Sequence, residues 1–201
     1  MTRFGMLIEA NKCTACKACM VACVNRNNTP PGVHWNNVQI KEEGTHSNMS
    51  VQNISTGCMH CENAPCVEVC PVGASLKTDD GIIIVDYEKC IGCEACIAAC
   101  PYDARQKIEK ISPYEPDYGF TDKETAGYAA FKEGTVTKCV FCKDWLVQGL
   151  SPACVHTCIY DARHFGDLDD PDSEISKMIV ERKAVQLLPE KDTNPSVYYV
   201  N

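Results

Sequence analysis

Short apolar stretches alternate with polar, cysteine-rich loops along this chain, and each stretch has the length of a strand or a short helix. Phe4 to Glu9 is mostly apolar and predicts a strand that leads into the first cysteines. Gly81 to Asp86 predicts a second strand, because it follows an Asp-Asp-Gly turn and contains four consecutive apolar residues. The segment from Ser173 to Lys183 predicts a helix with Ser173 as its N-cap.

Proline and glycine divide the polar stretches between these elements. They mark residues 24–57 and 106–137 as irregular, and we predict loop-rich insertions within them at residues 31–53 and 111–137. No stretch approaches the roughly 18 apolar residues of a membrane span, so we expect no direct membrane span. The N-terminal residues show no export signal, so we expect any export to depend on a partner.

Composition changes this picture, because 16 of the 201 residues are cysteine, far more than an ordinary domain carries. All of them fall into four groups of four. The first and third groups have the spacing C-x2-C-x2-C-x3-C, the second C-x2-C-x4-C-x3-C and the fourth C-x2-C-x11-C-x3-C. The groups are Cys13, Cys16, Cys19 and Cys23; Cys58, Cys61, Cys66 and Cys70; Cys90, Cys93, Cys96 and Cys100; and Cys139, Cys142, Cys154 and Cys158.

Three kinds of chemistry compete for this pattern. Disulfides suit small secreted chains and are awkward between cysteines only two residues apart. Four-cysteine zinc sites use C-x2-C pairs but do not explain three closely spaced cysteines followed by a fourth. The run C-x2-C-x2-C-x3-C is the [4Fe–4S] motif of bacterial ferredoxins, in which the fourth cysteine ligates the other cluster of a pair. The pattern therefore favours iron–sulfur clusters.

A short repeat follows three of the groups and supports duplication. The segments 70–74, 100–105 and 158–163 share a cysteine followed four residues later by alanine, and the last two end in Asp-Ala-Arg. Four similar units predict an α+β fold of two ferredoxin-like modules, each holding two [4Fe–4S] clusters. We expect Pro71 and Pro101 to begin helices after the fourth cysteine.

The net charge and the side chains other than cysteine suggest few further functions. The formal net charge of −8 argues against nucleic acid as a partner. We interpret His60 as a hydrogen-bonding residue beside a cluster rather than a ligand, and Trp35 and Trp145 as packing residues. Three lysines that precede a group could tune a cluster or simply be solvated, and both interpretations stay open: Lys12, Lys89 and Lys138.

The four groups, in this order and spacing, resemble the iron–sulfur (B) subunits of dimethyl-sulfoxide-reductase-type molybdoenzyme complexes. Segment 58–71 is similar to that family's second motif, and segments 165–171 and 194–199 also look like it. The polysulfide and arsenate reductase B subunits look most similar, because the chain is short and shows no C-terminal anchor.

The resemblance implies a pairing of groups. Groups one and four would form one module, from residues 1–30 and 138–170, and groups two and three the other, from residues 54–110; residues 171–201 would form a C-terminal tail that packs on a partner or on the chain's own core. The implied ligand sets are Cys13, Cys16, Cys19 and Cys158; Cys139, Cys142, Cys154 and Cys23; Cys58, Cys61, Cys66 and Cys100; and Cys90, Cys93, Cys96 and Cys70.

The resemblance also implies a function. The chain would be a non-catalytic subunit of an anaerobic respiratory oxidoreductase, such as an arsenate or polysulfide reductase. It would relay electrons to or from a large subunit with a molybdopterin (Mo or W) cofactor, and a membrane quinone-binding subunit is a further implied partner. We expect a periplasmic location or the outer face of the cytoplasmic membrane, with a cytoplasmic location as the alternative. The competing function is a free polyferredoxin, or the relay of a hydrogenase or formate dehydrogenase-type enzyme.

Overall fold

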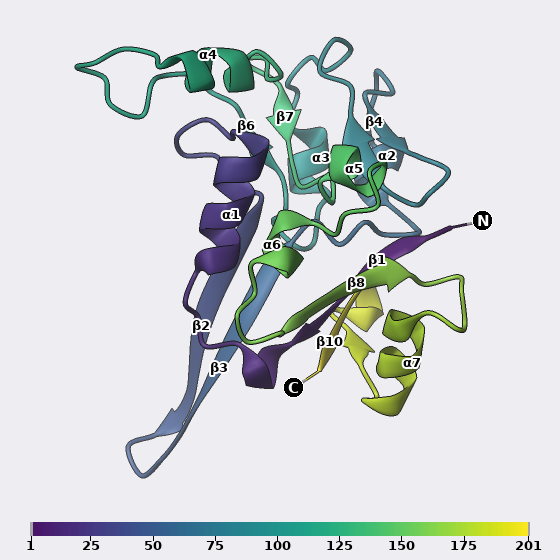
Figure 1. Cartoon of the computed structure of the whole chain (residues 1–201). Coiled ribbons are helices and arrows are strands. Elements are labelled where there is room, and N and C mark those ends of the chain that lie inside the picture. The colour runs from purple at the N-terminus through teal and green to yellow at the C-terminus, as the bar shows by residue number, and fades with distance from the viewer. Residues whose placement is uncertain (1, 201) are drawn as a thin grey trace.

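The computed structural model describes residues 2–200 and places a small mixed sheet beside a set of short helices and hairpins (Figure 1). The strands are β1 (Phe4–Glu9), β2 (Asn36–Thr45), β3 (Asn48–Gly57), β4 (Ser75–Lys77), β5 (Ile83–Val85), β6 (Gln106–Lys107), β7 (Val136–Thr137), β8 (Arg163–Asp167), β9 (Val185–Gln186) and β10 (Val197–Val200). The helices are α1 (Ala18–Asn27), α2 (Pro65–Glu68), α3 (Ala95–Ala98), α4 (Asp122–Tyr128), α5 (Lys143–Leu146), α6 (Ala153–His156) and α7 (Glu174–Glu181), with 3-10 turns η1 (Ala10–Lys12) and η2 (Pro189–Lys191).

The largest sheet has the order β8-β1-β10-β9 and joins the two ends of the described chain. Strand β1 has the bounds that its apolar run predicts, and it lies between β8, which is antiparallel to it, and β10, which is parallel. Tyr199 of β10 is 2% exposed. The C-terminal segment therefore packs on the chain's own core, one of the two outcomes that the sequence left open.

Helix α7 covers one face of this sheet. Its Ile175 and Met178 form an apolar cluster with the fully buried Leu7 of β1. The predicted cap is confirmed, because the Ser173 hydroxyl accepts a hydrogen bond from the Ser176 N–H at 3.2 Å. The helix ends at Glu181, two residues before the predicted end.

Two small hairpins flank the cysteine loops. Strands β4 and β5 pair antiparallel, as do β6 and β7, so each strand that follows one group pairs with the strand that precedes the next. Strand β5 covers only the centre of the predicted segment 81–86. The prediction of helices starting at Pro71 and Pro101 is wrong, because both prolines lie in turns; the short helices end before the fourth cysteine instead.

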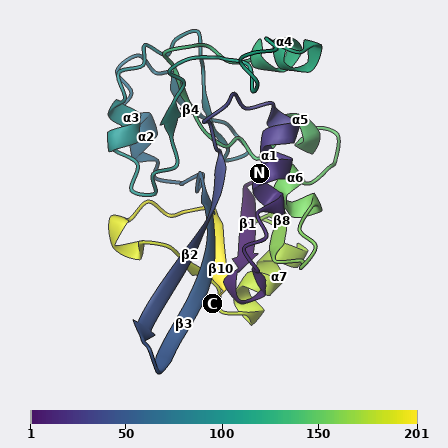
Figure 2. The ribbon, with the colours of Figure 1, turned by 90° about the vertical axis from the view of Figure 1, so that its left-hand side faces the viewer.

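The insertions contain more regular structure than their prolines and glycines suggest. Strands β2 and β3 form a long hairpin that extends away from the rest of the molecule, on the opposite side from α4 (Figures 1 and 2). Helix α4 has a capping box, in which Thr121 and Glu124 satisfy each other's backbone N–H groups. Within residues 2–200, no helix is long and apolar enough to cross a membrane.

Candidate functional site

All four cysteine groups have one backbone feature in common. The residue before the second cysteine is left-handed in each group: Ala15 (φ 55°), His60 (φ 45°), Gly92 (φ 66°) and Phe141 (φ 53°). This conformation costs a non-glycine residue about 1–2 kcal/mol. Its recurrence in four unlike sequences indicates that the loop must turn there to bring its cysteines together.

The third cysteine of each group occupies the same place in a short helix. It is the second residue of α1, α2, α3 and α6 in turn, and the fourth cysteine follows four residues later. Helix α1 contacts α6, and α2 contacts α3. The structure thus brings group one beside group four and group two beside group three.

Two of the predicted ligand sets each line a single cavity. Cys13, Cys16, Cys19 and Cys158 surround one cavity, together with Ile8 of β1. A second cavity is lined by Cys70, Cys90, Cys93 and Cys96. Each cavity therefore takes three cysteines from one group and the fourth from the paired group.

The other two sets lie deeper. Cys23, Cys139, Cys142 and Cys154 line a third cavity, which Cys58 of group two also reaches. Burial, and then the charge of Cys58, raise the pKa of the Cys61 thiol to about 12. A hydrogen bond with Thr193 opposes this rise, and the charges of Cys66 and Cys100 add to it. These neighbours are the remaining members of the predicted third set.

Burial governs the protonation of the inner thiols. It raises the pKa of Cys139 to about 12, with the charge of Cys154 as the next cause. It also raises the pKa of Cys23 strongly, helped by the charges of Cys139, Cys154 and Cys142. These thiols stay protonated at neutral pH without a metal, and iron binding must therefore release protons.

Hydrogen-bond donors surround the sulfur atoms. The Ala74 N–H donates to Cys70 Sγ at 3.2 Å and the Ala162 N–H to Cys158 Sγ at 3.3 Å, and both alanines belong to the short repeat that follows these groups. Asn27 Nδ2 lies 3.6 Å from Cys23 Sγ. Such donors stabilise negative charge on sulfur.

The donor set fits iron–sulfur clusters. The sixteen cysteines are all free thiols. No three His, Cys, Asp or Glu side chains of the described part converge on a point where they could hold one metal ion. A cubane has a different requirement, because each of its four thiolates binds a separate iron atom.

Two arginines that the sequence pattern did not single out lie among these cysteines. Arg105 and Arg163 are 4% and 6% exposed, and Arg105 Nη2 donates to Cys66 Sγ at 2.9 Å. The signal was present in the sequence, because both arginines end the repeated Asp-Ala-Arg tail.

The histidine, lysine and tryptophan residues singled out in the sequence have different surroundings. His60 is fully buried, accepts a hydrogen bond from the Ile83 N–H at 3.0 Å and stacks on Phe141, as a packing and hydrogen-bonding residue would. Lys138 is 2% exposed and donates to the carbonyls of Ile83 and Cys139.

Lys12 and Lys89 are more exposed than Lys138 and pair with Glu9 and Asp86. Trp35 is buried and donates to Thr137 Oγ1 at 3.0 Å. Arg26 stacks on Trp145, with its guanidinium carbon 4.7 Å from the ring centroid.

Two family models match the chain, and both are described as a 4Fe-4S dicluster domain. One covers residues 12–74 and the other residues 49–129. Together they extend over the first three cysteine groups.

Relatives with known names match almost the whole chain. A protein of Halobacterium salinarum, named as the iron–sulfur B subunit of a dimethyl sulfoxide reductase, is 44% identical over 100% of this chain and 80% of its own length. The iron–sulfur subunit of the arsenate respiratory reductase of a Shewanella species is 36% identical over 98% and 96%. The B component of the polysulfide reductase of Wolinella succinogenes is also 36% identical, over 98% and 94%.

Proposed function

Since this chain is a member of the family of iron–sulfur B subunits of molybdoenzyme complexes, we propose that it relays electrons to or from a molybdopterin-containing catalytic subunit. It is an electron-transfer subunit with four [4Fe–4S] clusters. The observation that carries the assignment is the combination of sixteen cysteines in four sets with similarity, over nearly the whole chain, to proteins that are named as reductase iron–sulfur or B subunits. The chain itself would catalyse no reaction on an organic substrate.

The chemistry supplied by a bound [4Fe–4S] cluster is the gain or loss of one electron. The protein's own residues do the rest. Thiolates fix each cubane in place, N–H groups such as those of Ala74 and Ala162 compensate negative charge on sulfur, and buried neighbours such as Ile8 and Phe141 exclude water.

We assign the ligands as the family resemblance implies. The cavities and the neighbours of Cys61 support this assignment, because each groups three cysteines of one motif with the fourth of its partner. The proposed sets are Cys13, Cys16, Cys19 and Cys158 (first cluster); Cys139, Cys142, Cys154 and Cys23 (second); Cys58, Cys61, Cys66 and Cys100 (third); and Cys90, Cys93, Cys96 and Cys70 (fourth).

These sets give the relay an order. Cys58 of the third set reaches the cavity of the second, so these two sites are neighbours in the interior. Cys16 of the first set and Cys93 of the fourth are exposed. We propose that electrons enter and leave through these two outer sites, in the order first, second, third and fourth or the reverse.

The same contacts support a division into two modules. Residues 1–30 with 138–170 would form one, supported by the contact of α1 with α6 and the pairing of β1 with β8. Residues 54–110 would form the other, supported by the contact of α2 with α3. We further propose that the complex works on the outer side of the cytoplasmic membrane, with a quinone-linked subunit as the second electron partner.

Anaerobic purification of the chain with its bound partners tests the assignment. About 16 iron atoms per chain, which is four cubanes, with a brown colour that bleaches on dithionite addition, is the expected result. A stoichiometric large subunit with molybdenum or tungsten would identify the partner. A colourless protein with zinc would contradict the proposal, and an iron-loaded monomer that reduces many enzymes would indicate a free polyferredoxin.

A further inference from the structure

Two buried cations lie inside the cluster-binding region without a carboxylate partner. Arg105 and Arg163 are almost inaccessible to solvent. Within residues 2–200 neither makes an ion pair with Asp or Glu. The side chains that most raise the pKa of these two arginines are cysteines, and the Lys138 ammonium also lies near Arg105. Burying an unpaired guanidinium is strongly unfavourable, so each needs a source of negative charge.

Arg105 lies between the proposed third and fourth sites. Its Nη2 donates to Cys66 Sγ at 2.9 Å, a ligand of the third set. On the other side, burial raises the pKa of Cys96, a ligand of the fourth set, while the charge and a hydrogen bond of Arg105 oppose that rise. One guanidinium therefore donates a hydrogen bond to a ligand of the third set and lies near enough to a ligand of the fourth set to oppose the rise in its pKa.

Arg163 occupies the equivalent place in the other module. Burial raises the pKa of Cys154, a ligand of the second set, and the charge and a hydrogen bond of Arg163 oppose that rise. Arg163 lines both the cavity of the second set and the cavity of the first set. Burial lowers the pKa of Arg163, but the charges of cysteines from both sets, Cys154 and then Cys19 and Cys158, help to raise it. Its Nη2 is held by Asn36 Oδ1 at 2.8 Å and by the Ser55 hydroxyl.

The sequence repeat explains why the pair formed by groups two and three has a single arginine. Ser75 takes the position after group two that Arg105 takes after group three, and its hydroxyl accepts from Arg105 Nη1 at 2.8 Å. The two related positions thus meet at the centre of the module. A second guanidinium there would repel the first, and the serine instead fixes its orientation.

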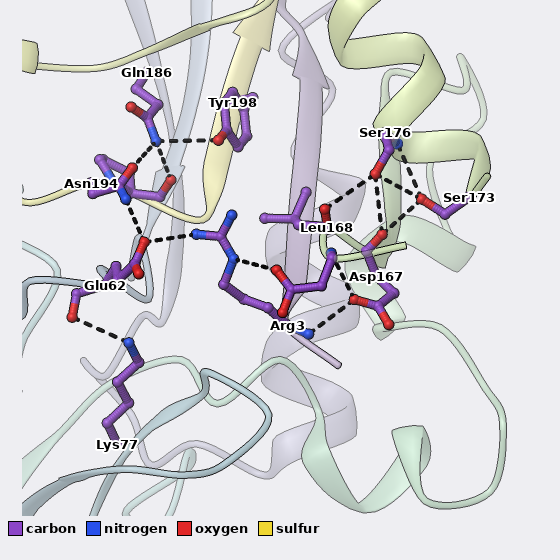
Figure 3. A network of polar contacts seen from close by, with 12 residues as sticks. Arg3, Glu62, Lys77, Asp167, Leu168, Ser173, Ser176, Gln186, Asn194 and Tyr198 are labelled. Atoms are coloured by element: carbon purple, nitrogen blue, oxygen red, sulfur yellow. Dashed lines mark hydrogen bonds and ion pairs between the residues drawn. The ribbon is translucent and has the colours of Figure 1, made fainter. Parts of the chain in front are cut away.

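A surface arginine shows the contrast. Arg3 pairs with Glu62 at 3.2 Å and with Asp169 at 3.3 Å, in a network of carboxylates and amides at the protein surface (Figure 3). Its charge is neutralised by neighbouring side chains. For Arg105 and Arg163, by contrast, the cysteine sulfur atoms are the neighbours that can neutralise the positive charge.

We propose that Arg105 and Arg163 are positioning residues that each supply the counter-charge for one pair of clusters and raise the reduction potentials of both members together. The inference rests on the proposed ligand sets. Reduction adds negative charge to a cluster, so a fixed nearby cation and a hydrogen bond to sulfur favour the reduced form. The two modules can then be set to different potentials by separate residues.

The test uses the complex purified anaerobically and a redox titration followed by electron paramagnetic resonance, together with iron analysis. The variants are Arg105→Gln, Arg163→Gln and the double variant. Arg105→Lys and Arg163→Lys keep the charge, and Arg3→Gln is the matched control, because it removes an arginine that carboxylates already neutralise.

We expect Arg105→Gln to lower the potentials of two of the four clusters and Arg163→Gln to lower those of the other two. The double variant should lower all four, the lysine variants should lie near the unchanged protein, and Arg3→Gln should shift none. Loss of half of the iron in a glutamine variant, restored by lysine, would also support the role as counter-charge.

Four unchanged potentials at full iron content would overturn the inference. It would equally be overturned if either glutamine variant shifted all four clusters alike, or if lysine and glutamine lost the same amount of iron, since packing rather than charge would then be responsible. Failure of the proposed function has a different signature, because the unchanged protein itself would then lack four clusters.

Discussion

A single left-handed residue precedes the second cysteine of every group, and Gly92 is the one glycine among the four. A Cβ atom at Gly92 would overlap the carbonyl oxygen of Gly134. The glycine is therefore required by a close backbone approach and not only by its φ angle. Ala15, His60 and Phe141 tolerate side chains at the same place in their loops.

We predict that Gly92→Ala destabilises the fourth cluster site by well over the ~1–2 kcal/mol that a left-handed alanine costs by itself. Gly73 gives the matched control, because it has a similar φ of 61° but no atom within 4 Å of the place where an alanine methyl group would lie. Iron per chain and the thermal midpoint measure the effect. Equal losses for Gly92→Ala and Gly73→Ala would refute the role of the Gly134 contact.

Glu9 is a second residue whose substitution has a predictable effect, because its buried carboxylate contacts three basic groups. Its side chain is 3% exposed and contacts Lys12 at 3.0 Å, His164 at 2.8 Å and Arg182. Burial alone would raise the pKa of Glu9, but hydrogen bonds from Lys12 and His164 outweigh it, and the net direction is downward.

We expect Glu9→Gln to lower the stability of the protein at pH 7 by about 1–3 kcal/mol. A carboxyl group whose pKa is lower in the folded state stabilises the fold at pH values above its pKa in the unfolded state. This stabilisation is lost as the pH falls through the pKa of the folded state. The difference between Glu9→Gln and the unchanged protein, measured by urea denaturation, should therefore shrink in acid. The exposed Glu181→Gln is the control, and a difference that grows in acid would contradict the argument.

At the scale of elements, prediction succeeded where one local signal decides the structure. The apolar run of β1 and the serine cap of α7 needed no knowledge of distant residues. The hairpin β2–β3 was missed because its outer part is exposed on both faces, so the alternation of apolar and polar positions that marks a half-buried strand is absent there. The four-residue helices α2, α3 and α6 are too short for any periodicity to predict.

The outer part of the hairpin should be dispensable for the fold. Replacing residues 41–52 by Asn-Gly would join Ile40 directly to its partner Asn53 through a two-residue turn. We expect unchanged iron content and an unchanged far-ultraviolet circular dichroism spectrum apart from the lost strands. The control is Val38→Asp, which places a charge at a buried position beside the first cluster site and should reduce iron content.

At the scale of the whole molecule, the cysteines replace much of an ordinary core. The main apolar cluster contains Cys19, Cys61, Cys66, Cys96 and Cys154 among its buried members. The spacing of the cysteines indicated the clusters, and the family resemblance indicated which groups pair. The two buried arginines could not be placed in this way, because their role depends on two groups meeting in space.

Removal of iron should therefore unfold most of the chain. With sixteen thiolates and four 2+ cores, the formal net charge changes from −8 to about −16, and this charge is tolerated only while iron and N–H donors balance it. We expect anaerobic chelation to abolish the thermal transition and most of the near-ultraviolet circular dichroism. Native-like spectra after complete iron loss would show that the polypeptide folds by its own packing.

The pairing of group one with group four and of group two with group three is nested along the chain, and this sets an order for biosynthesis. As the polypeptide leaves the ribosome, the inner module has all its cysteines once Cys100 has emerged. The outer module must wait for Cys158, and its sheet must wait for β10, which is synthesised later still. The cell therefore has to keep the cysteines of group one reduced and unoccupied while the inner pair is already able to receive iron.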